Sequence, residues 1–389
     1  MKIFNCDHCG HPVFFENVTC LNCDSTLAFL PGPLTLAALE PVPGAAAPAL
    51  WQRRDGEADG TRYRMCRNHD LYQACNFAVP ADDANPLCLS CRQTRLLPDL
   101  SAPSNLERWY RIEAAKRRLY YTLARLGLMP TVSGTAPVEA PVFEFLADLP
   151  GEPPVLTGHR QGVITLNVAE ADDDERARRR LALHEPYRTL LGHLRHESGH
   201  YYWDRLILAP KRLASFREVF GDESADYLKA LEAHYAAGAS AGDAWQEAHV
   251  SAYATAHPWE DWAETWAHYL HMVDLLETAS TYQTTVVVPG AGPGQAAGAS
   301  GPVANPFAAG DSDFDEMVRQ WVPVTLLLNS LNRSLGQNDA YPFALREGAL
   351  RKLRYVHDVI QASTGPAAAA ATPVAAPQAA QKTSPPAAA

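Results

Sequence analysis

Three residues suited to metal binding and proton transfer fall within five positions near the middle of the chain. His196 and His200 are four residues apart, and Glu197 directly follows the first histidine. On a helix, residues four apart lie on one face, so both imidazoles can reach one metal ion. Zinc suits imidazole ligands, and a catalytic zinc keeps three protein ligands plus a water. The pattern predicts that Glu197 takes a proton from this water as the water attacks a carbonyl.

The sequence around this motif favours the helix that the geometry requires. Pro186 predicts a helix start, and residues 187–208 contain no further proline. Leu190, Leu191 and Leu194 recur at helical spacing. The motif fixes only three residues, so an ordinary surface helix with two histidines and a glutamate is an equal interpretation of the motif alone.

A second stretch supplies the carboxylates that a three-ligand zinc site still lacks. Pro258 marks a helix start, and Glu260 and Glu264 lie one turn apart on that helix, opposite an aromatic stripe. We expect Glu260 to bind the metal and Glu264 to accept the N–H of a ligating histidine. Glu264, His257 and His268 stay open as alternative third ligands. The other interpretation is an exposed acidic helix face.

Eight cysteines form two sets with metal-binding spacing. The first set consists of two Cys-x-x-Cys pairs, a strong zinc-ribbon signal. Its members are Cys6, Cys9, Cys20 and Cys23. The second set is less regular, because Cys66 and Cys75 lie farther apart than the close pair Cys88 and Cys91. A second four-cysteine zinc site is expected, with His69 as an alternative to one cysteine of the wider pair.

Composition narrows the class of protein. A net charge of -11 argues against a general nucleic-acid or membrane-surface binder. We see no secretion signal, and no stretch approaches the roughly 20 apolar residues of a membrane span. A cytoplasmic protein is therefore expected, in which the cysteines stay reduced and are explained by zinc rather than by disulfides.

Changes in composition along the 389 residues predict the domain organisation. Residues 1–100 form the zinc-ribbon region with two four-cysteine sites. Residues 101–363 form a second domain that holds the histidine motif. Residues 284–312 are rich in glycine, alanine and proline and are expected to be a flexible insertion. Residues 364–389 consist mainly of alanine and proline, which predicts a disordered tail.

A long amphipathic helix is expected directly after the ribbon region. Apolar residues recur at helical spacing from Asn105 onward, and Gly127 is a plausible stop. The helix carries three consecutive basic residues, Lys116, Arg117 and Arg118. We expect them to form a solvated basic face, with contact to an anionic partner as the alternative.

Several stretches of the chain together resemble a bacterial family of zinc-binding metallopeptidases with an N-terminal zinc-ribbon domain. The stretches are Cys88–Arg92, Ala115–Leu119, Ala169–Asp173, Pro186–His193, His196–Trp203 and Ala256–His268. The resemblance covers residues 1 to about 363, apart from the insertion. It implies an α+β fold, in which a small zinc-ribbon region precedes a mostly helical, gluzincin-like peptidase domain with a small sheet.

The resemblance also bears on individual site residues. In gluzincins the third zinc ligand is the first acid of a Glu-x-x-x-Asp/Glu pair. The resemblance therefore favours Glu260 as the ligand and Glu264 as the residue that accepts a hydrogen bond from a ligating histidine. Some gluzincins place a tyrosine across the zinc to stabilise the oxyanion, and Tyr253 is the candidate here. An edge strand above the motif helix binds extended substrate in such peptidases, and we expect Ile164–Val168 to fill that role. An ordinary sheet strand is the alternative.

The expected function is therefore a zinc-dependent peptidase with one catalytic and two structural zinc ions and a peptide or protein substrate. One alternative is a scaffold protein, in which the ribbons bind a protein partner and the third zinc is not catalytic. Another is a nucleic-acid-binding ribbon protein, which the acidic balance of the chain disfavours. The sequence does not specify the substrate.

Overall fold

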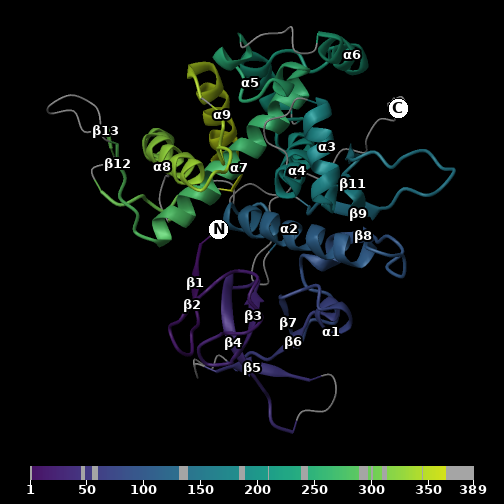
Figure 1. Ribbon diagram of the computed structural model, residues 1–389, viewed down its shortest axis with the longest axis vertical. Coiled ribbons are helices and arrows are strands. Elements are labelled where there is room, and N and C mark those ends of the chain that lie inside the picture. The colour runs from purple at the N-terminus through teal and green to yellow at the C-terminus, as the bar shows by residue number, and fades with distance from the viewer. Residues whose placement is uncertain are drawn as a thin grey trace.

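The structure is a computed structural model in which one long helix separates a strand-rich part from a helical part. It describes residues 2–44, 49–54, 60–130, 139–183, 189–208, 210–237, 244–288, 297–298, 301–308, 313–343 and 345–364. The N-terminal strands lie at one end, the helices lie at the other, and α2 (Asn105–Arg125) crosses between them (Figure 1). This arrangement confirms the expected α+β class, with a cysteine-rich region before a mostly helical domain.

Antiparallel strands build the N-terminal part. A small hairpin comes first, and a five-stranded meander follows in the order β3-β4-β5-β6-β7. The strands are β1 (Phe4–Asn5), β2 (Pro12–Val13), β3 (Thr26–Leu30), β4 (Thr35–Pro41), β5 (Trp51–Arg53), β6 (Tyr63–Met65) and β7 (Ala78–Pro80). The short helix α1 (Arg67–Tyr72) lies between the last two strands. The core of this part includes Phe29, whose ring lies 4.5 Å from that of Phe77.

The basic residues of α2 are not the solvated face that the sequence predicts. Lys116 and Arg117 are 1% and 3% exposed, and only Arg118 reaches the surface. Lys116 pairs with the buried Glu113 at 2.9 Å, and Arg117 donates to the carbonyl of Ala74. The expectation was wrong because both faces of this helix are covered, one by the ribbon region and one by the helical domain, so these charges are neutralised inside the protein.

A four-stranded mixed sheet lies beside the motif helix in the order β10-β11-β9-β8. The strands are β8 (Thr94–Leu96), β9 (Val142–Leu146), β10 (Gly158–Arg160) and β11 (Val163–Asn167). The expected edge strand, Ile164–Val168, mostly coincides with β11, which pairs with neighbours on both sides. That expectation was wrong, because Gln161 and Gly162 form a two-residue turn with positive φ that adds β10 as the outer strand.

Two helices cross at the centre of the helical domain, α4 (Leu190–Leu206) and α7 (Pro258–Thr281). At the crossing, a Cβ atom on Gly199 would lie only 2.8 Å from the Cα of Ala263. Trp262 Nε1 donates to the Gly199 carbonyl at 2.8 Å, and Trp266 Nε1 donates to Ser198 Oγ at 3.0 Å. A glycine on one helix and indole donors on the other therefore fix this close approach.

Further helices surround this crossing. They are α3 (Asp173–Leu183), α5 (Pro210–Phe220), α6 (Tyr227–Ala237), α8 (Phe314–Ser334) and α9 (Glu347–Thr364). Single helical turns also occur at η1 (Cys91–Gln93), η2 (Val168–Ala171), η4 (Ala244–Glu247) and η5 (Tyr253–Thr255). Among the residues that the structure describes, no helix has the length and apolar character that crossing a membrane requires.

Only part of the expected insertion, residues 284–312, lies within the described residues. It contains the short pair β12 (Val287–Val288) and β13 (Ala297–Gly298). Val303 is buried, and the backbone N–H of Ala304 donates to Gln320 of α8. At least this portion packs against the domain. The expected tail lies outside the described residues from position 365 onward.

Candidate metal centre and active site

The helix that carries the motif begins nearly two turns before its first histidine. Thr189 caps α4, because its Oγ1 accepts from the backbone N–H of Gly192 at 3.0 Å. The expected start at Pro186 lies outside the described residues. His196 and His200 project from the same face of α4, and their Nε2 atoms are 3.1 Å apart.

The second helix begins with a histidine that the sequence left open as a ligand. His257 caps α7, because its Nδ1 accepts from the N–H of Trp259 at 3.1 Å, while its Nε2 lies 3.1 Å from the carbonyl of Ala225. The other candidate, His268, lies farther along α7, and its Nδ1 is 2.7 Å from the hydroxyl of Tyr341. Neither histidine belongs to the group formed with His196.

Three potential ligand atoms form a nearly equilateral triangle. Glu260 Oε2 lies 3.0 Å from His196 Nε2 and 3.4 Å from His200 Nε2, beside the 3.1 Å separation of the two imidazoles. Zinc bonds of 2.0–2.1 Å at tetrahedral angles place ligand atoms about 3.3 Å apart. Glu260 Oε2 is also buried without a hydrogen-bond partner. The residues therefore fit a zinc ion, and a buried acceptor of this kind needs a cation.

The Glu264 carboxylate contacts His196 at Nδ1, the ring nitrogen that does not face Glu260. Glu264 Oε1 lies 2.7 Å from His196 Nδ1, and its Oε2 accepts from Ser251 Oγ at 2.6 Å. Burial would raise the pKa of Glu264, but the hydrogen bond and charge of His196 outweigh burial and lower the pKa to about 2. This contact directs His196 Nε2 toward Glu260, as an outer carboxylate does for a metal-binding histidine.

The charges of this group favour a cation. Burial would lower the pKa of His196, but close contact with the Glu260 and Glu264 carboxylates and their charges raises it well above its usual value. Negative charge therefore faces this imidazole from two sides, which favours a cation beside it. A ligating histidine must be neutral, so a metal ion would bind the unprotonated Nε2.

A tyrosine that the sequence analysis missed completes the surroundings of Glu260. The hydroxyl of Tyr227, at the start of α6, donates to Glu260 Oε1 at 2.7 Å. The Tyr227 ring packs edge-on against His257 and Trp259. No local pattern links Tyr227 to the motif, since it precedes Glu260 by 33 residues.

Glu197 differs from the other acids at the site. It is only 8% exposed, yet the described residues give its carboxylate no hydrogen bond or ion pair. A buried carboxylate without a partner is costly. Glu197 directly follows His196 on α4, and its carboxylate is available to a water or a substrate.

Two aromatic residues border the histidines. The Tyr253 ring lies 6.0 Å from that of His196, and burial followed by the charge of Glu260 raises the Tyr253 pKa well above its usual value. Tyr253 is thus a neutral hydroxyl donor near the site. Trp259 stacks against His200 with ring centroids 3.7 Å apart, which restricts the rotation of that imidazole.

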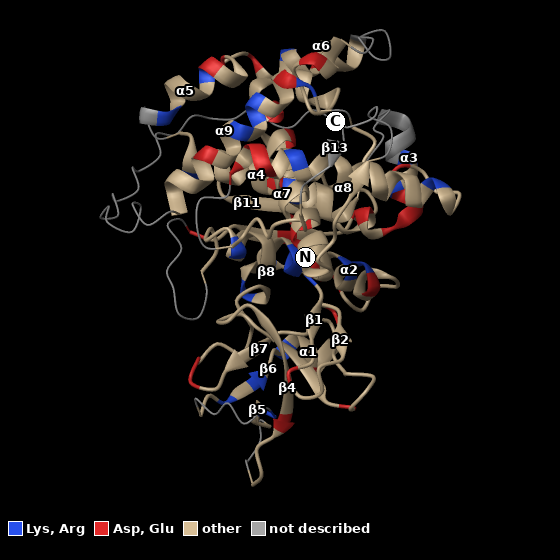
Figure 2. Ribbon diagram, turned by 90° about the vertical axis from the view of Figure 1, so that its left-hand side faces the viewer, with Lys and Arg blue, Asp and Glu red and all other residues tan. Residues whose placement is uncertain are grey.

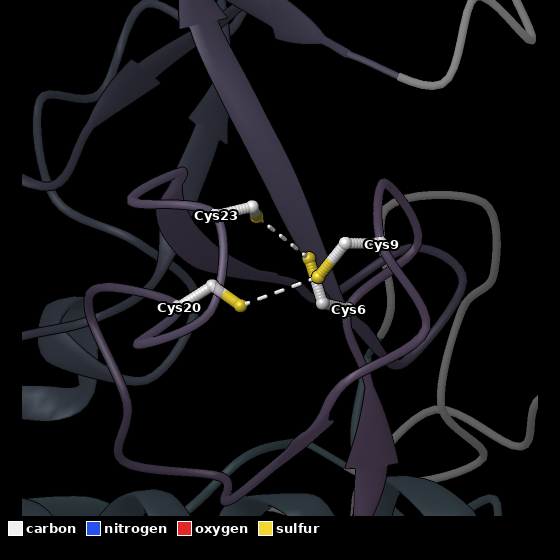
Figure 3. A group of neighbouring side chains, drawn as sticks. All are labelled: Cys6, Cys9, Cys20 and Cys23. Atoms are coloured by element: carbon white, nitrogen blue, oxygen red, sulfur yellow. Dashed lines mark hydrogen bonds between the residues drawn. The ribbon is translucent and has the colours of Figure 1, made fainter.

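The first cysteine set forms a compact cluster with its sulfurs directed inward (Figure 3). Cys6 Sγ and Cys23 Sγ are 3.8 Å apart. Cys9 Sγ and Cys20 Sγ are 3.6 Å apart. Four thiolates at 2.3 Å from a tetrahedral zinc would be separated by about 3.8 Å, so this cluster fits a zinc ion.

The second set also converges, despite its irregular spacing. Cys75 Sγ lies 3.7 Å from Cys88 Sγ and 3.6 Å from Cys91 Sγ, and Cys66 belongs to the same group. All four thiols are buried. His69, the alternative ligand, lies outside this group, with its Nδ1 2.9 Å from the carbonyl of Cys75.

Charged residues of α2 lie against the second cluster. Cys91 Sγ is 3.9 Å from a carboxylate oxygen of Glu113. Burial lowers the pKa of Arg117, but the charges of Cys75 and Cys91 outweigh burial and raise it. Four thiolates and one zinc ion carry a net charge of −2, which a buried guanidinium helps to offset.

Comparison with known proteins agrees with this architecture. Residues 105–359 match the model of a family described as "Putative zinc-binding metallo-peptidase", and residues 3–102 match that of a zinc-ribbon domain. The first match covers more than half of the chain. The protein therefore belongs to this zinc-binding metallopeptidase family, and the resemblance seen in the sequence is confirmed.

Mycobacterial proteins are among its relatives. An uncharacterized protein of Mycobacterium bovis is 40% identical over 361 residues, which covers 92% of this chain and 95% of the relative. Uncharacterized proteins from two strains of Mycobacterium tuberculosis match with the same identity and coverage. No solved structure matches the chain.

Proposed function

We propose that this protein is a gluzincin-like zinc peptidase that hydrolyses peptide bonds. One observation carries the proposal: Glu260 Oε2 is buried without a hydrogen bond and completes a triangle of 3.0–3.4 Å with two imidazole nitrogens. Helix α4, which carries both imidazoles, also carries Glu197, whose carboxylate has no hydrogen bond or ion pair within the described part of the chain. Three protein ligands with an adjacent base are the arrangement of a catalytic zinc site, which leaves one position for water.

The residues of the site have separate roles in this proposal. Zinc held by His196, His200 and Glu260 would supply a Lewis acid and a water of lowered pKa. Glu197 takes the proton from the attacking water and passes it to the nitrogen of the leaving amine. Tyr253 donates its hydroxyl proton as a hydrogen bond to the oxyanion that develops at the scissile carbonyl.

The edge of the mixed sheet is suited to an extended peptide. Among the strands that the structure describes, β10 pairs with β11 alone, so its other edge offers backbone groups that a substrate strand can pair with. β10 also lies close to the motif helix, since the ring of His159 is 5.9 Å from that of Tyr201 on α4. A peptide or protein segment bound along β10 would run past the metal centre.

The two cysteine clusters are proposed to hold structural zinc, which gives three zinc ions per chain with one catalytic. Each cluster offers four thiolates, and a site with four protein ligands leaves no position for a substrate. Reduced thiols are kept in the cytoplasm, where we place the enzyme. Basic and acidic residues are interspersed along the helices (Figure 2), which gives no support to a nucleic-acid surface.

The test is Glu197→Gln, assayed for zinc content and for cleavage of a mixed peptide library by mass spectrometry. We expect the variant to keep its zinc and to lose cleavage by at least about 100-fold, because the proton acceptor is gone. The matched control is Glu152→Gln, which changes an exposed loop glutamate. Cleavage by Glu197→Gln at the wild-type rate would overturn the mechanism. A wild-type protein that holds the third zinc but cleaves no peptide would favour the scaffold alternative, in which that zinc is not catalytic.

A further inference from the structure

The two oxygens of the Glu260 carboxylate have different surroundings. Oε1 accepts a hydrogen bond from the Tyr227 hydroxyl at 2.7 Å. Oε2 has no hydrogen bond and faces both imidazoles. A carboxylate can bind zinc through one oxygen or through two. With one oxygen held by a tyrosine, only the other is directed at the metal position.

Tyr227 is itself held in place by its neighbours. Its ring centroid lies 5.3 Å from that of His257 and 5.7 Å from that of Trp259, both in edge-on contacts. The Tyr227 hydroxyl lies 2.7 Å from Glu260 Oε1. A carboxylate oxygen accepts and a tyrosine hydroxyl donates, so the hydrogen bond runs from tyrosine to carboxylate.

The helix that supplies Tyr227 is only loosely packed. No described side chain of α6 is buried. Besides Tyr227, the contacts of α6 with the site come from His234, whose ring lies 5.8 Å from that of Tyr253 and whose Nδ1 is 3.3 Å from Thr255 Oγ1. A half-buried tyrosine at the start of a helix that has no buried side chain is better explained by its contact with Glu260 than by support of a core.

We propose that Tyr227 is a positioning residue that holds Glu260 as a one-oxygen metal ligand and so preserves an open position for water and substrate. The inference rests on the proposed zinc site and adds a residue that determines how many oxygens of Glu260 bind the metal. Without the hydroxyl, Glu260 Oε1 can also turn toward the metal. A ligand with two bound oxygens would then occupy part of the position that the water requires.

The experiment uses the full-length protein carrying Tyr227→Phe, which keeps the ring and removes only the hydroxyl. The control is Tyr282→Phe, which alters an exposed tyrosine at the far end of α7. The most weakly held zinc is removed with a chelator, the remaining zinc content is checked, and Zn²⁺ or Co²⁺ alone is titrated back. Cobalt in a site of histidine and carboxylate ligands gives a visible spectrum that depends on coordination number.

Tyr227→Phe is expected to change the cobalt spectrum toward a higher coordination number and to change zinc affinity by about 10-fold or more, the effect typical of partners behind metal ligands. In a Glu260→Ala background, the same change should have no further effect on affinity, because Tyr227 acts through that carboxylate. Tyr282→Phe should behave as the wild type.

The outcomes separate this inference from the proposed function. A wild-type protein that binds no metal beyond its two cysteine sites would overturn both. A wild-type third site, with a spectrum and affinity that Tyr227→Phe leaves unchanged, would overturn only the positioning role. The positioning role would also be overturned if Tyr227→Phe lowered zinc affinity equally in the wild type and in the Glu260→Ala variant. Tyr227 would then support the fold rather than this ligand.

Discussion

The cysteine clusters and the histidine–glutamate centre are assembled in different ways. In the first cluster all four thiols come from residues 6–23, and their positions follow from two tight turns. The centre draws His196 and His200 from α4 and Glu260 from α7, so its geometry depends on how two helices cross. A local turn can specify a closed metal site, whereas an open site requires tertiary packing to hold three ligands and leave a fourth position free.

The two kinds of site also differ in what surrounds them. Each cysteine cluster groups four thiols, whereas the centre groups three potential ligands. Two of these three residues have a specific hydrogen-bond partner: Glu264 for His196 and Tyr227 for Glu260. The comparison indicates that loss of a cysteine should damage the fold first, while loss of a residue at the centre should damage metal binding and activity first.

The largest effect is expected from Cys91→Ser in the second cluster. This thiol is 1% exposed and lies against Glu113 of α2, so loss of its zinc would leave buried thiols and charges without compensation. We expect one zinc fewer per chain and a thermal midpoint lower by about 10 °C or more. Cys23→Ser, in the less buried first cluster, should lower the midpoint less. If calorimetry showed a larger drop in the thermal midpoint for Cys23→Ser than for Cys91→Ser, the idea that the more buried cluster stabilises the fold more would be contradicted.

Gly199→Ala tests whether the helix crossing builds the centre. The added Cβ would lie 2.8 Å from the Cα of Ala263, so α4 and α7 must move apart. We expect a loss of about 1–3 kcal/mol in the free energy of unfolding and loss of the third zinc, with both cysteine-bound zinc ions retained. Denaturant unfolding and zinc analysis measure the two effects. Gly301→Ala is the control, because no atom lies within 4 Å of its added Cβ.

The double variant His196→Ala/His200→Ala separates metal content from stability. Three zinc ions per chain should fall to two, while the thermal midpoint changes less than in Cys91→Ser, since the two helices keep their tryptophan contacts. Elemental analysis and calorimetry on the same preparations provide the comparison. Two zinc ions in both the wild type and the variant would mean that the centre is empty as purified, and the scaffold alternative would gain support.

The smallest effect is expected from Glu264→Gln. The amide oxygen can still accept from His196 Nδ1, but the negative charge that makes this imidazole a stronger ligand is lost. Zinc affinity at the centre should fall by about 10-fold without a change in stoichiometry at saturating zinc. Ser251→Ala, which removes a hydrogen bond to the same carboxylate, should have a smaller effect in the same chelator competition. An unchanged affinity in Glu264→Gln would contradict the orienting role.

Sequence reasoning succeeded where chemistry and spacing coincide. Four-residue spacing placed His196 and His200 on one helix face, and the carboxylate one turn into the second helix lies against them. The start of α7 was signalled by Pro258. That these residues bind zinc and hydrolyse peptides stays a prediction, since proximity alone does not show metal binding.

The failures share a different cause, because each depends on contacts between distant segments. Tyr227 on α6 meets Glu260 on α7 only in the folded chain, because 33 residues separate them. Lys116 and Arg117 carry charge, so they were expected in solvent, yet the ribbon region and the helical domain cover them from two sides. The extra strand β10 follows from the turn at Gln161-Gly162, a signal that was present in the sequence but overlooked.

The buried charges of α2 bear on how the protein can be divided. The two family matches meet between residues 102 and 105, which invites a cut at that junction. A helical fragment made this way would lose Thr94, which receives hydrogen bonds from the Lys116 side chain and donates to Glu113. It would also lose the thiolates beside Arg117. Such a fragment would also leave Arg117 without the Ala74 carbonyl and uncover Trp109 and Tyr121, whose rings pack against Tyr72 and Phe4. We therefore expect the separated helical part to aggregate and the full-length chain to be the unit to express.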